Sequence, residues 1–392
     1  MATGKRIRTL HILDGLERRG AETFAVQLVD RLSREVFFPA IWSIKPIESE
    51  SYLVPHHTPV FTRTVDGIGR PVVYGTVRVL LDVLHTYRPD LIHCHGGRAL
   101  KYAVAAKPFW RARGYVYTKI GSVHPWLDHP IKRRFYGMLL EQVDAVVAVG
   151  DEIRREVVQV FHPRRPRVLT IHTGREPATF AGVTPEVIAR KRAELGLGPL
   201  DLCLQTVGAI SWEKDPQLLL RIFVELVREH PRLRLAFVGG GPLEAEVRQQ
   251  AVRAGVQDYV RFLGIRTDVP ELLCAADIFV LPSVTEGLPG VLIEAGMAGL
   301  PAVAFRVGSV ADILKDGVTG FVVPPKNAEM FKQRLRQLIC DADLRRSMGQ
   351  EALRLCRRDF DIAQSVRGYE ALFCGLLDAS MGPSRAAVRQ SG

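Results

Sequence analysis

Two carboxylates, Glu286 and Glu294, stand eight positions apart in residues 283–305, SVTEGLPGVLIEAGMAGLPAVAF. The first follows an apolar run that predicts a buried strand, and the second lies within a helical pattern. Pro289 near the start of that pattern and Gly299 just past its end are typical of helix termini. The sequence therefore predicts one carboxylate in a loop at the carboxyl end of a strand and another in the helix that follows.

The start of this predicted helix would suit a phosphate. Backbone N–H groups and the positive end of the helix dipole gather there, and Gly287 and Gly290 would let an anion approach the backbone closely. Glu294, about one and a half turns further on, could accept hydrogen bonds from ribose hydroxyls, and Glu286 from a sugar beyond the phosphates. On spacing alone, a loop glutamate beside a solvated helix glutamate is the commoner explanation.

The elements that position these residues alternate along the chain between short apolar runs and longer amphipathic stretches. Runs such as LIHCH and AVVAVG predict strands, and stretches such as AETFAVQLVDRLSRE predict helices. This alternation indicates βαβ units and parallel sheets with helices on both faces. The predicted fold class is α/β, with two tandem Rossmann-like, doubly wound domains that face a central cleft and bind ligands at the carboxyl ends of their strands.

The alternation breaks once, at residues 173–200, which begin with turn-rich sequence and contain no strand pattern. We place the domain boundary there. The predicted parts are a first domain (1–175), a linker (176–200), a second domain (201–362), a C-terminal helix (363–379) and a disordered tail (380–392).

The positive charge is concentrated in the first half of the chain. Residues 1–180 hold 27 Lys and Arg against 17 Asp and Glu, whereas residues 181–392 hold 26 against 25. Such a charge can attract nucleic acid, anionic lipid or an anionic substrate, but no nucleic-acid-binding signature accompanies it, so we expect no nucleic-acid partner. Six scattered cysteines without zinc spacing predict reduced thiols, and no apolar run is long enough to cross a membrane. We therefore expect a cytoplasmic protein.

The spacing of Glu286 and Glu294, within its strand–loop–helix context, resembles the E-x7-E motif of retaining glycosyltransferases of family GT4, which have the GT-B fold. Further stretches resemble the same family over nearly the whole chain, among them LERRGAETFAVQLVDRL, RPDLIHCHG, AVVAVGDEIRREV, VGAISWEKD and GVTGFVVPP. The stretch DFDIAQSVRGYEALFCGLL resembles the C-terminal helix that, in this family, returns to the first domain.

The resemblance implies that the second domain binds a nucleotide-diphosphate sugar and the first a saccharide or lipid-linked saccharide acceptor. The activity would serve a cell-surface glycan such as lipopolysaccharide or exopolysaccharide. The transferred sugar would keep its anomeric configuration through a transition state resembling an oxocarbenium ion. Negative charge would then grow on the leaving β-phosphate, and Lys214 matches the family's phosphate-binding lysine. We expect no metal or other cofactor, since no D-x-D cluster lies in a plausible donor loop.

The resemblance also assigns roles to individual residues. The candidate catalytic residues are Glu286 and Lys214. The candidate donor-binding residues are Glu294, Gly287, Leu288, Pro289, Gly290, Gly20, Gly208, Gly241 and Arg266. The candidate acceptor or sugar contacts are His95, Lys119 and His124.

Two departures from the family pattern concern the donor segment and the domain junction. Where the family often has Gly-Arg-Leu, this chain has Gly208, Ala209 and Ile210, so one cation for the diphosphate is missing. Arg266 or an arginine of the first domain is the expected substitute. The segment IHTGREP stands where an Asn-Gly pair is usual, and we expect it to make no direct contact with the chemistry.

A third departure lies in the first domain. Ile120 stands where many members have a histidine that reaches the donor sugar, and Lys119 or His124 is the expected replacement. These departures leave two other interpretations open. One is a nucleotide-sugar 2-epimerase of similar fold, and the other is a nucleotide-sugar-binding subunit without catalysis.

Family members that build lipid-linked glycans dock on the inner face of the cell membrane through a basic first domain. The charge of residues 1–180 is compatible with such peripheral contact, at roughly 1 kcal/mol for each basic residue near anionic lipid. An anionic saccharide acceptor, or an ordinary solvated surface, would explain it equally well. The candidate membrane contacts are Arg111, Arg113, Lys132, Arg133, Arg134, Phe109, Trp110 and Trp126.

Overall fold

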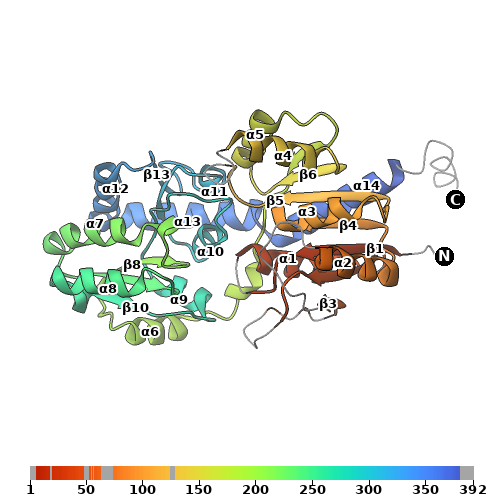
Figure 1. The fold of residues 1–392 in the computed structure, drawn as a ribbon. Coiled ribbons are helices and arrows are strands. Elements are labelled where there is room, and N and C mark those ends of the chain that lie inside the picture. The colour runs from red at the N-terminus through yellow and green to blue at the C-terminus, as the bar shows by residue number, and fades with distance from the viewer. Residues whose placement is uncertain are drawn as a thin grey trace. The chain divides into compact units, whose positions relative to one another are not determined.

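The computed structural model describes residues 6–17, 20–47, 53, 55, 57–62, 74–123 and 129–379. These residues form two compact units. The first takes the described residues up to Thr173 and from Ile362 onward, and the second runs from Gly174 to Asp361. Each unit is built on one parallel sheet with helices packed against it (Figure 1). The predicted α/β class is confirmed.

The first unit contains a sheet of seven strands in the order β3-β2-β1-β4-β5-β6-β7. The strands are β1 (Ile7–Leu13), β2 (Phe37–Ser43), β3 (Val60–Thr62), β4 (Leu91–His95), β5 (Gly114–Lys119), β6 (Ala145–Ala148) and β7 (Arg167–Thr170). The helices are α1 (Gly20–Arg31), α2 (Tyr74–Tyr87), α3 (Gly97–Ala106), α4 (Pro130–Leu140), α5 (Asp151–Phe161) and α14 (Ile362–Ala379). The central strands are buried along their whole length, which explains their continuous apolar sequence.

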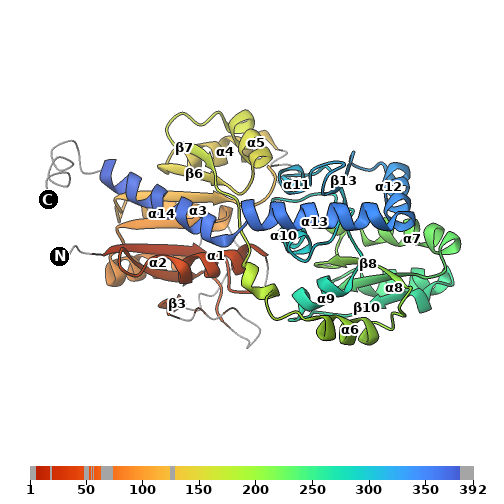
Figure 2. The same ribbon diagram turned by 180° about the vertical axis from the view of Figure 1, so that it is seen from behind.

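Helix α14 covers one face of this sheet, although it is the last helix of the chain (Figure 2). Its Tyr369 and Phe373 pack with Phe24 of α1 and Val116 of β5 in one apolar cluster. The Tyr369 hydroxyl lies 3.0 Å from Thr118 Oγ1. The first unit is therefore completed by a segment that lies about two hundred residues away from its other helices in the sequence.

The second unit contains a sheet of six strands in the order β10-β9-β8-β11-β12-β13. The strands are β8 (Leu202–Val207), β9 (Leu233–Val238), β10 (Val260–Phe262), β11 (Ile278–Leu281), β12 (Ala302–Phe305) and β13 (Gly320–Val323). The helices are α6 (Pro185–Glu194), α7 (Pro216–Glu229), α8 (Glu244–Arg253), α9 (Val269–Ala275), α10 (Gly290–Met297), α11 (Val310–Ile313), α12 (Ala328–Cys340) and α13 (Ala342–Asp359).

The segment expected as a linker, residues 176–200, is part of the second unit. Thr184 caps helix α6, which packs against α9. Arg192 of α6 donates to the Ala275 carbonyl at 2.9 Å and lies 3.2 Å from Asp277. The prediction was wrong here because a segment without strand pattern was taken as a connection, although a polar helix can still be held by side-chain contacts.

The strand order of the second sheet reverses between β8 and β11, which are neighbours in the sheet but far apart in the sequence. The connections that leave these two strands at their carboxyl ends run in opposite directions, and such a point is where open α/β sheets bind ligands. Lys214 follows β8 and Glu286 follows β11. The fold therefore brings the two candidate catalytic residues to the same edge.

Candidate active site

Glu286 lies in the loop that joins β11 to α10, and neighbouring backbone holds this loop in place. The Ser309 N–H donates to the Gly287 carbonyl at 2.7 Å. Gly308 has a φ of 49°, and a Cβ at this position would lie 2.2 Å from the Glu286 carbonyl oxygen. Only glycine fits there. The backbone of the loop is therefore fixed, and the Glu286 side chain is only 10% exposed.

Lys214 reaches Glu286 from the neighbouring strand. After β8 the chain makes a turn and a short 3-10 helix, Trp212–Lys214. Asp215, in the left-handed region with a φ of 43°, then caps α7 by accepting from the Leu218 N–H at 3.1 Å. This arrangement places Lys214 Nζ 2.6 Å from Glu286 Oε1. The sequence predicted both residues as site candidates, and the structure brings them together.

This ion pair can serve a ligand that is anionic at one end and hydroxylated at the other. The Lys214 ammonium has three N–H donors, of which the pair uses one. A phosphate could accept the others, while the Glu286 carboxylate accepts from hydroxyl groups. Both side chains are mostly buried, so solvent screens such contacts less than at an open surface.

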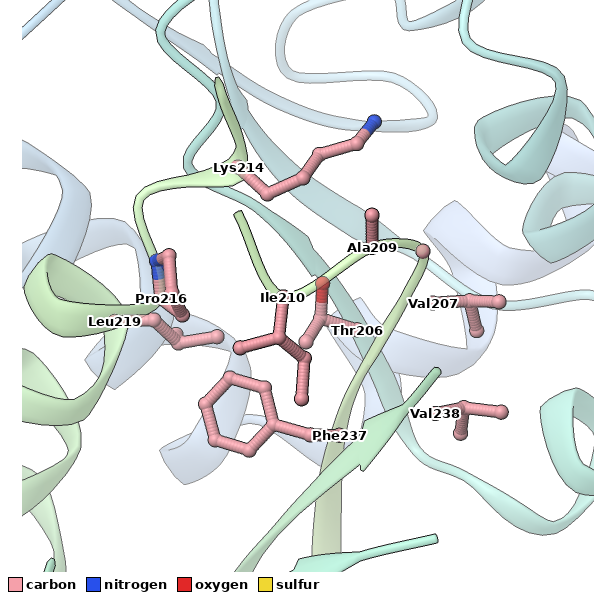
Figure 3. Close-up of a pocket in the computed structure, with 10 residues that line it drawn as sticks. Thr206, Val207, Ala209, Ile210, Lys214, Pro216, Leu219, Phe237 and Val238 are labelled. Atoms are coloured by element: carbon pink, nitrogen blue, oxygen red, sulfur yellow. The ribbon is translucent and has the colours of Figure 1, made fainter. Parts of the chain in front are cut away.

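The wall beside Lys214 is apolar (Figure 3). Ile210, Leu219 and Phe237 line a small pocket there, and the lysine side chain extends past them with its amine directed away. The pocket volume of about 10 Å³ leaves room for roughly one water molecule, so it is no place for a sugar. Ile210 belongs to the core of the unit. It stands in the position of the family's leucine, whereas Ala209, which stands in the position of the missing cation, also lines the pocket.

Two glycine turns pack against each other next to this wall. A Cβ at Gly239 would lie 2.0 Å from the Gly208 carbonyl oxygen, and a Cβ at Gly241 would lie 2.5 Å from the Ile210 carbonyl oxygen. The Gly208 N–H donates to the Val238 carbonyl at 2.9 Å. Close backbone packing therefore explains the glycines at 239 and 241, and donor contacts of Gly208 and Gly241 stay predictions.

Glu294, the second carboxylate of the motif, is bound by an arginine that the sequence analysis missed. Arg175 Nε lies 2.7 Å from Glu294 Oε1. Arg175 belongs to the IHTGREP segment, so this segment contacts a candidate donor-binding residue, and the expectation that it makes no direct contact with the chemistry stays a prediction. No spacing rule links positions 175 and 294, and the only sequence signal was a charged residue in a short junction.

Arg266, the expected substitute for the missing cation, is paired within its own unit. Its Nη2 atom lies 2.6 Å from Asp268 Oδ2 and 2.7 Å from Glu194 Oε1. The hydrogen bonds from the Arg266 guanidinium hold the pKa of Asp268 well below its usual range. Two carboxylates therefore already offset the charge of Arg266, and a role with the donor stays a prediction.

The remaining candidates lie in the first unit. Gly20 is the first residue of α1, and His124 lies outside the described residues. His95 ends β4, where burial lowers its pKa to about 3, so the ring is neutral at physiological pH. Lys119 ends β5 and donates to the Ser122 carbonyl at 3.1 Å, and burial lowers the pKa of its amine to about 8.

Three buried histidines gather beneath helix α14. His11 Nδ1 lies 3.2 Å from His95 Nε2, and His93 Nε2 lies 2.7 Å from Thr118 Oγ1. One nitrogen from each of the three rings lies within 4.8 Å of the others, so the three could together ligate a divalent metal ion. Burial and the neighbouring His95 lower the pKa of His11, and the positive charge of Arg34 lowers it further. The described contacts of these rings are hydrogen bonds and ring packing, and the expectation that the protein binds no metal stays a prediction.

A cavity of about 520 Å³ opens in the first unit at the ends of α3, α4, α5 and β5. Its walls are mostly apolar, and three lysines interrupt them. The lining residues that define its character are Tyr117, Phe135, Phe161, Lys101, Lys119 and Lys132. A cavity of this size falls within the usual range for small-molecule sites. It places the candidate Lys119 at a site that could take an anionic ligand with an apolar part.

Two family models match the chain. Residues 18–179 match the model described as Glycosyltransferase Family 4, and residues 188–354 match that of Glycosyl transferases group 1. The chain belongs to this glycosyltransferase family. EpsD of Bacillus subtilis (strain 168), to which a glycosyltransferase activity is assigned provisionally, is 27% identical over 321 residues, covering 79% of this chain and 82% of EpsD. The N-acetyl-alpha-D-glucosaminyl L-malate synthase of Bacillus anthracis is 26% identical over 299 residues, covering 74% of this chain and 75% of that enzyme.

Solved structures show the same fold. The structure of HepE from Anabaena, in complex with UDP and glucose, superposes with a TM-score of 0.83 at 21% identity, covering 94% of this chain and all of HepE. The architecture of two Rossmann-like units is therefore the GT-B fold of glycosyltransferases. The family and fold inferred from the E-x7-E spacing are confirmed, and the chain is a glycosyltransferase enzyme.

Proposed function

We propose that this glycosyltransferase transfers a sugar, with retention of anomeric configuration, from a nucleotide-diphosphate sugar on the second unit to a saccharide or lipid-linked saccharide. The product would be a cell-surface glycan or its precursor. The ion pair of Lys214 and Glu286, at 2.6 Å and at the carboxyl ends of adjacent strands, carries the proposal. It provides a cation for the diphosphate and, next to it, an acceptor for sugar hydroxyls.

The reaction breaks the bond between the anomeric carbon and the β-phosphate oxygen and forms a bond from the acceptor oxygen to that carbon. Both bonding electrons leave with the nucleoside diphosphate, so negative charge grows on its β-phosphate. Lys214 stabilises this charge, a contribution of the kind that is typically worth 10²–10³-fold, or about 3–4 kcal/mol. The acceptor proton passes to the departing phosphate. Glu286 holds the donor sugar, and Glu294 accepts hydrogen bonds from the ribose.

The proposed reaction places no metal or other cofactor between the donor and these residues. Lys214 and the N–H groups at the start of α10 supply positive charge instead. Neither the nucleotide nor the sugar of the donor follows from the residues of this chain, but the structurally similar HepE was solved with UDP and glucose. A uridine nucleotide is therefore the first donor to test.

The cavity of the first unit supports an acceptor with an anionic group. Its three lysines stand among apolar walls, and the N-acetyl-alpha-D-glucosaminyl L-malate synthase is named for a product that contains malate, a dicarboxylate. An acceptor with a phosphate or carboxylate beside an apolar segment would match both features of the cavity. The lipid-linked saccharides of glycan assembly are molecules of this kind.

We propose in addition that the enzyme works in the cytoplasm and contacts the inner membrane face peripherally. Helix α4 exposes Ile131, Phe135 and Met138, spaced four and three residues apart, on a helix that also carries Lys132, Arg133 and Arg134. A helix with these properties can lie in a lipid interface. Among the other candidates Phe109 is exposed, Trp110 packs against the core, and Trp126 lies outside the described residues. None of the described helices has the length and apolar character needed to span a bilayer.

Product analysis tests the proposed reaction. The enzyme is incubated with UDP- and GDP-sugars, with and without membrane lipid extract as a source of acceptors, and the products are examined by mass spectrometry and NMR. A new glycosidic bond with the donor's anomeric configuration is expected. An epimerised nucleotide sugar formed without acceptor would favour the 2-epimerase, and donor binding without turnover would favour a binding subunit. An inverted linkage would overturn retention.

A further inference from the structure

Arg175 stands where the chain enters the second unit, and its backbone is fixed there. It is the second residue of the unit, which starts at Gly174. Its N–H donates to the Phe360 carbonyl at 2.8 Å, and it forms a parallel bridge with Asp361, the last residue of the unit. The two ends of the second unit are thus joined at this arginine, so the direction of its side chain is set by paired backbone.

The guanidinium of Arg175 lies against the start of helix α10. A Cβ at Gly290, the first residue of this helix, would lie 1.5 Å from Arg175 Nη2. The group can occupy this place only because residue 290 is glycine. Nη1 donates to the Gly174 carbonyl at 3.1 Å, and Nε donates to Glu294 Oε1 at 2.7 Å. The Arg175 side chain is only 8% exposed.

An arginine in such a place must be paired, because a charge taken out of water is costly unless a partner compensates it. Glu294 is that partner, and its side chain is more open than that of Arg175, at 26% exposed. The arginine occupies one oxygen of the carboxylate, and a carboxylate offers about four acceptor positions over two oxygens. Glu294 is therefore held in one orientation while retaining the capacity to accept hydrogen bonds from a ligand.

We propose that Arg175 is a positioning residue for the donor nucleotide. It fixes Glu294 in the rotamer that receives the ribose hydroxyls, so that binding does not have to order a flexible glutamate. This inference rests on the proposed function, in which Glu294 contacts the ribose. Its consequence is specific: Arg175 strengthens the binding of nucleotides with ribose hydroxyls and leaves nucleotides without them unaffected.

The test is a calorimetric titration of the full chain with UDP and GDP, and then with the 2′,3′-dideoxy form of the tighter binder. The wild type should bind the ribonucleotide more tightly. Arg175→Leu should weaken ribonucleotide binding about tenfold, the scale of one charge-assisted hydrogen bond, and leave dideoxynucleotide binding unchanged. Arg175→Lys should recover part of the loss. Combining Arg175→Leu with Glu294→Gln should cost no more than Glu294→Gln alone.

Arg234→Leu is the matched control. Arg234 is also a partly buried arginine of the second unit and lies 3.6 Å from Asp201, but it stands at the amino end of β9, away from the carboxyl edge. Its removal should lower thermal stability without changing the preference for the ribonucleotide. If Arg175→Leu does not fold, ribonucleotide and dideoxynucleotide binding are compared in Arg175→Lys instead. That variant should lose less affinity, and only for the ribonucleotide.

The outcomes separate the two levels of inference. Equal weakening of both nucleotides in the Arg175 variants would make the arginine merely structural, and tighter ribonucleotide binding would mean that it blocks Glu294. Either result overturns only the role proposed for Arg175 and leaves the proposed function of Glu294 standing. A wild type that binds neither nucleotide, or binds ribo and dideoxy forms equally, overturns the proposed function of Glu294 and with it this inference.

Discussion

In each sheet the two strands between which the strand order reverses lead to polar residues, and the two units use these residues in opposite ways. In the first unit, the paired strands β1 and β4 bring His11 beside His93 on the sheet, and both rings are buried and neutral. In the second unit, the paired strands β8 and β11 lead to Lys214 and Glu286, which are charged and partly open. A similar strand arrangement thus yields a closed hydrogen-bonded cluster in one unit and an ion pair ready for a ligand in the other.

The difference follows from what covers each position. Helix α14 packs Tyr369 and Phe373 against the rings of His93 and His11, and burial then keeps the histidines neutral. The loops after β8 and β11 leave Lys214 and Glu286 with some access to solvent. Strand order alone therefore marks a possible site, and the covering elements decide whether polar side chains there become structural or functional.

The largest effect should come from removing the cation of the ion pair. Lys214→Met should lower kcat by about 10²–10³-fold, since a stabiliser of transition-state charge is lost, and should also lower thermal stability, because the mostly buried Glu286 carboxylate loses its partner. The measurement is steady-state kinetics of sugar transfer, supported by a thermal melt. Lys332→Met is a matched control, because Lys332 also pairs with carboxylates, Glu225 and Glu329, but on helix α12. Near-wild-type turnover of the Lys214 variant would contradict the catalytic role of this edge.

The histidine cluster should make the free energy of unfolding depend on pH below neutrality. Burial lowers the pKa of His95 to about 3, and burial with the neighbouring histidines lowers those of His11 and His93. Between pH 6.5 and pH 3 the unfolded chain therefore binds more protons, so the free energy of unfolding falls as the pH falls. At pH 5 the loss from His95 is about 2 kcal/mol relative to pH 7.

Calorimetric melts from pH 7 to pH 5 check this expectation. The wild type should lose stability steadily, and His95→Gln should show a shallower dependence because one buried, titrating ring is gone. The slope, rather than the stability at any single pH, is the informative quantity. Identical slopes for both proteins would mean that His95 binds protons alike in the folded and the unfolded chain, and the contrast between the two units would no longer hold.

The sequence predicted the fold class and named both Lys214 and Glu286 as site candidates, because local patterns and the family resemblance suffice for that. Apolar runs identify the strands, and a residue just after a parallel strand must lie at the carboxyl edge of the sheet. The E-x7-E spacing likewise fixed Glu294 in helix α10, one turn beyond Gly290. These features need no knowledge of which distant segments touch.

The features that escaped prediction depend on contacts between distant segments. Arg175 and Glu294 are 119 residues apart, and no periodicity connects them. Helix α6 was taken for part of a linker because its packing partner α9 follows some eighty residues later. The histidine cluster combines β1, β4 and the last helix of the chain. Each case needs the tertiary structure, since residue type alone allows several partners.

A substitution at Gly290, the first residue of helix α10, tests the position of Arg175 without changing the arginine itself. Gly290→Ala places a Cβ where the Arg175 guanidinium lies, so the arginine must move and release Glu294. We expect ribonucleotide binding to weaken about tenfold, similar to the loss of one charge-assisted hydrogen bond. Calorimetric titration with the nucleoside diphosphate measures it. Gly182→Ala is the control, because nothing lies within 4 Å of its new methyl group. Unchanged binding in the Gly290 variant would show that the site tolerates displacement of Arg175.

The smallest effect is expected on the outer face of the first unit. If helix α4 rests on a membrane, replacing two exposed apolar residues, Ile131→Ser with Met138→Ser, should reduce binding to anionic lipid vesicles several-fold, because each buried apolar side chain contributes roughly 1.5–3 kcal/mol and only part of that area is inserted. Nucleotide binding, which we propose for the second unit, should stay unchanged.

Vesicle co-sedimentation at low and high salt separates the apolar from the electrostatic part of this contact. Val252→Ser is the control, since the exposed fraction of Val252, 61%, lies between those of Met138, 56%, and Ile131, 73%, but Val252 lies on helix α8 of the second unit. Raising the salt should weaken binding of the wild type through its basic residues, and the α4 variant should bind less at every salt concentration. Equal losses in the α4 and Val252 variants would mean that exposed apolar residues of either unit act alike. Membrane contact would then no longer distinguish the first unit from the second.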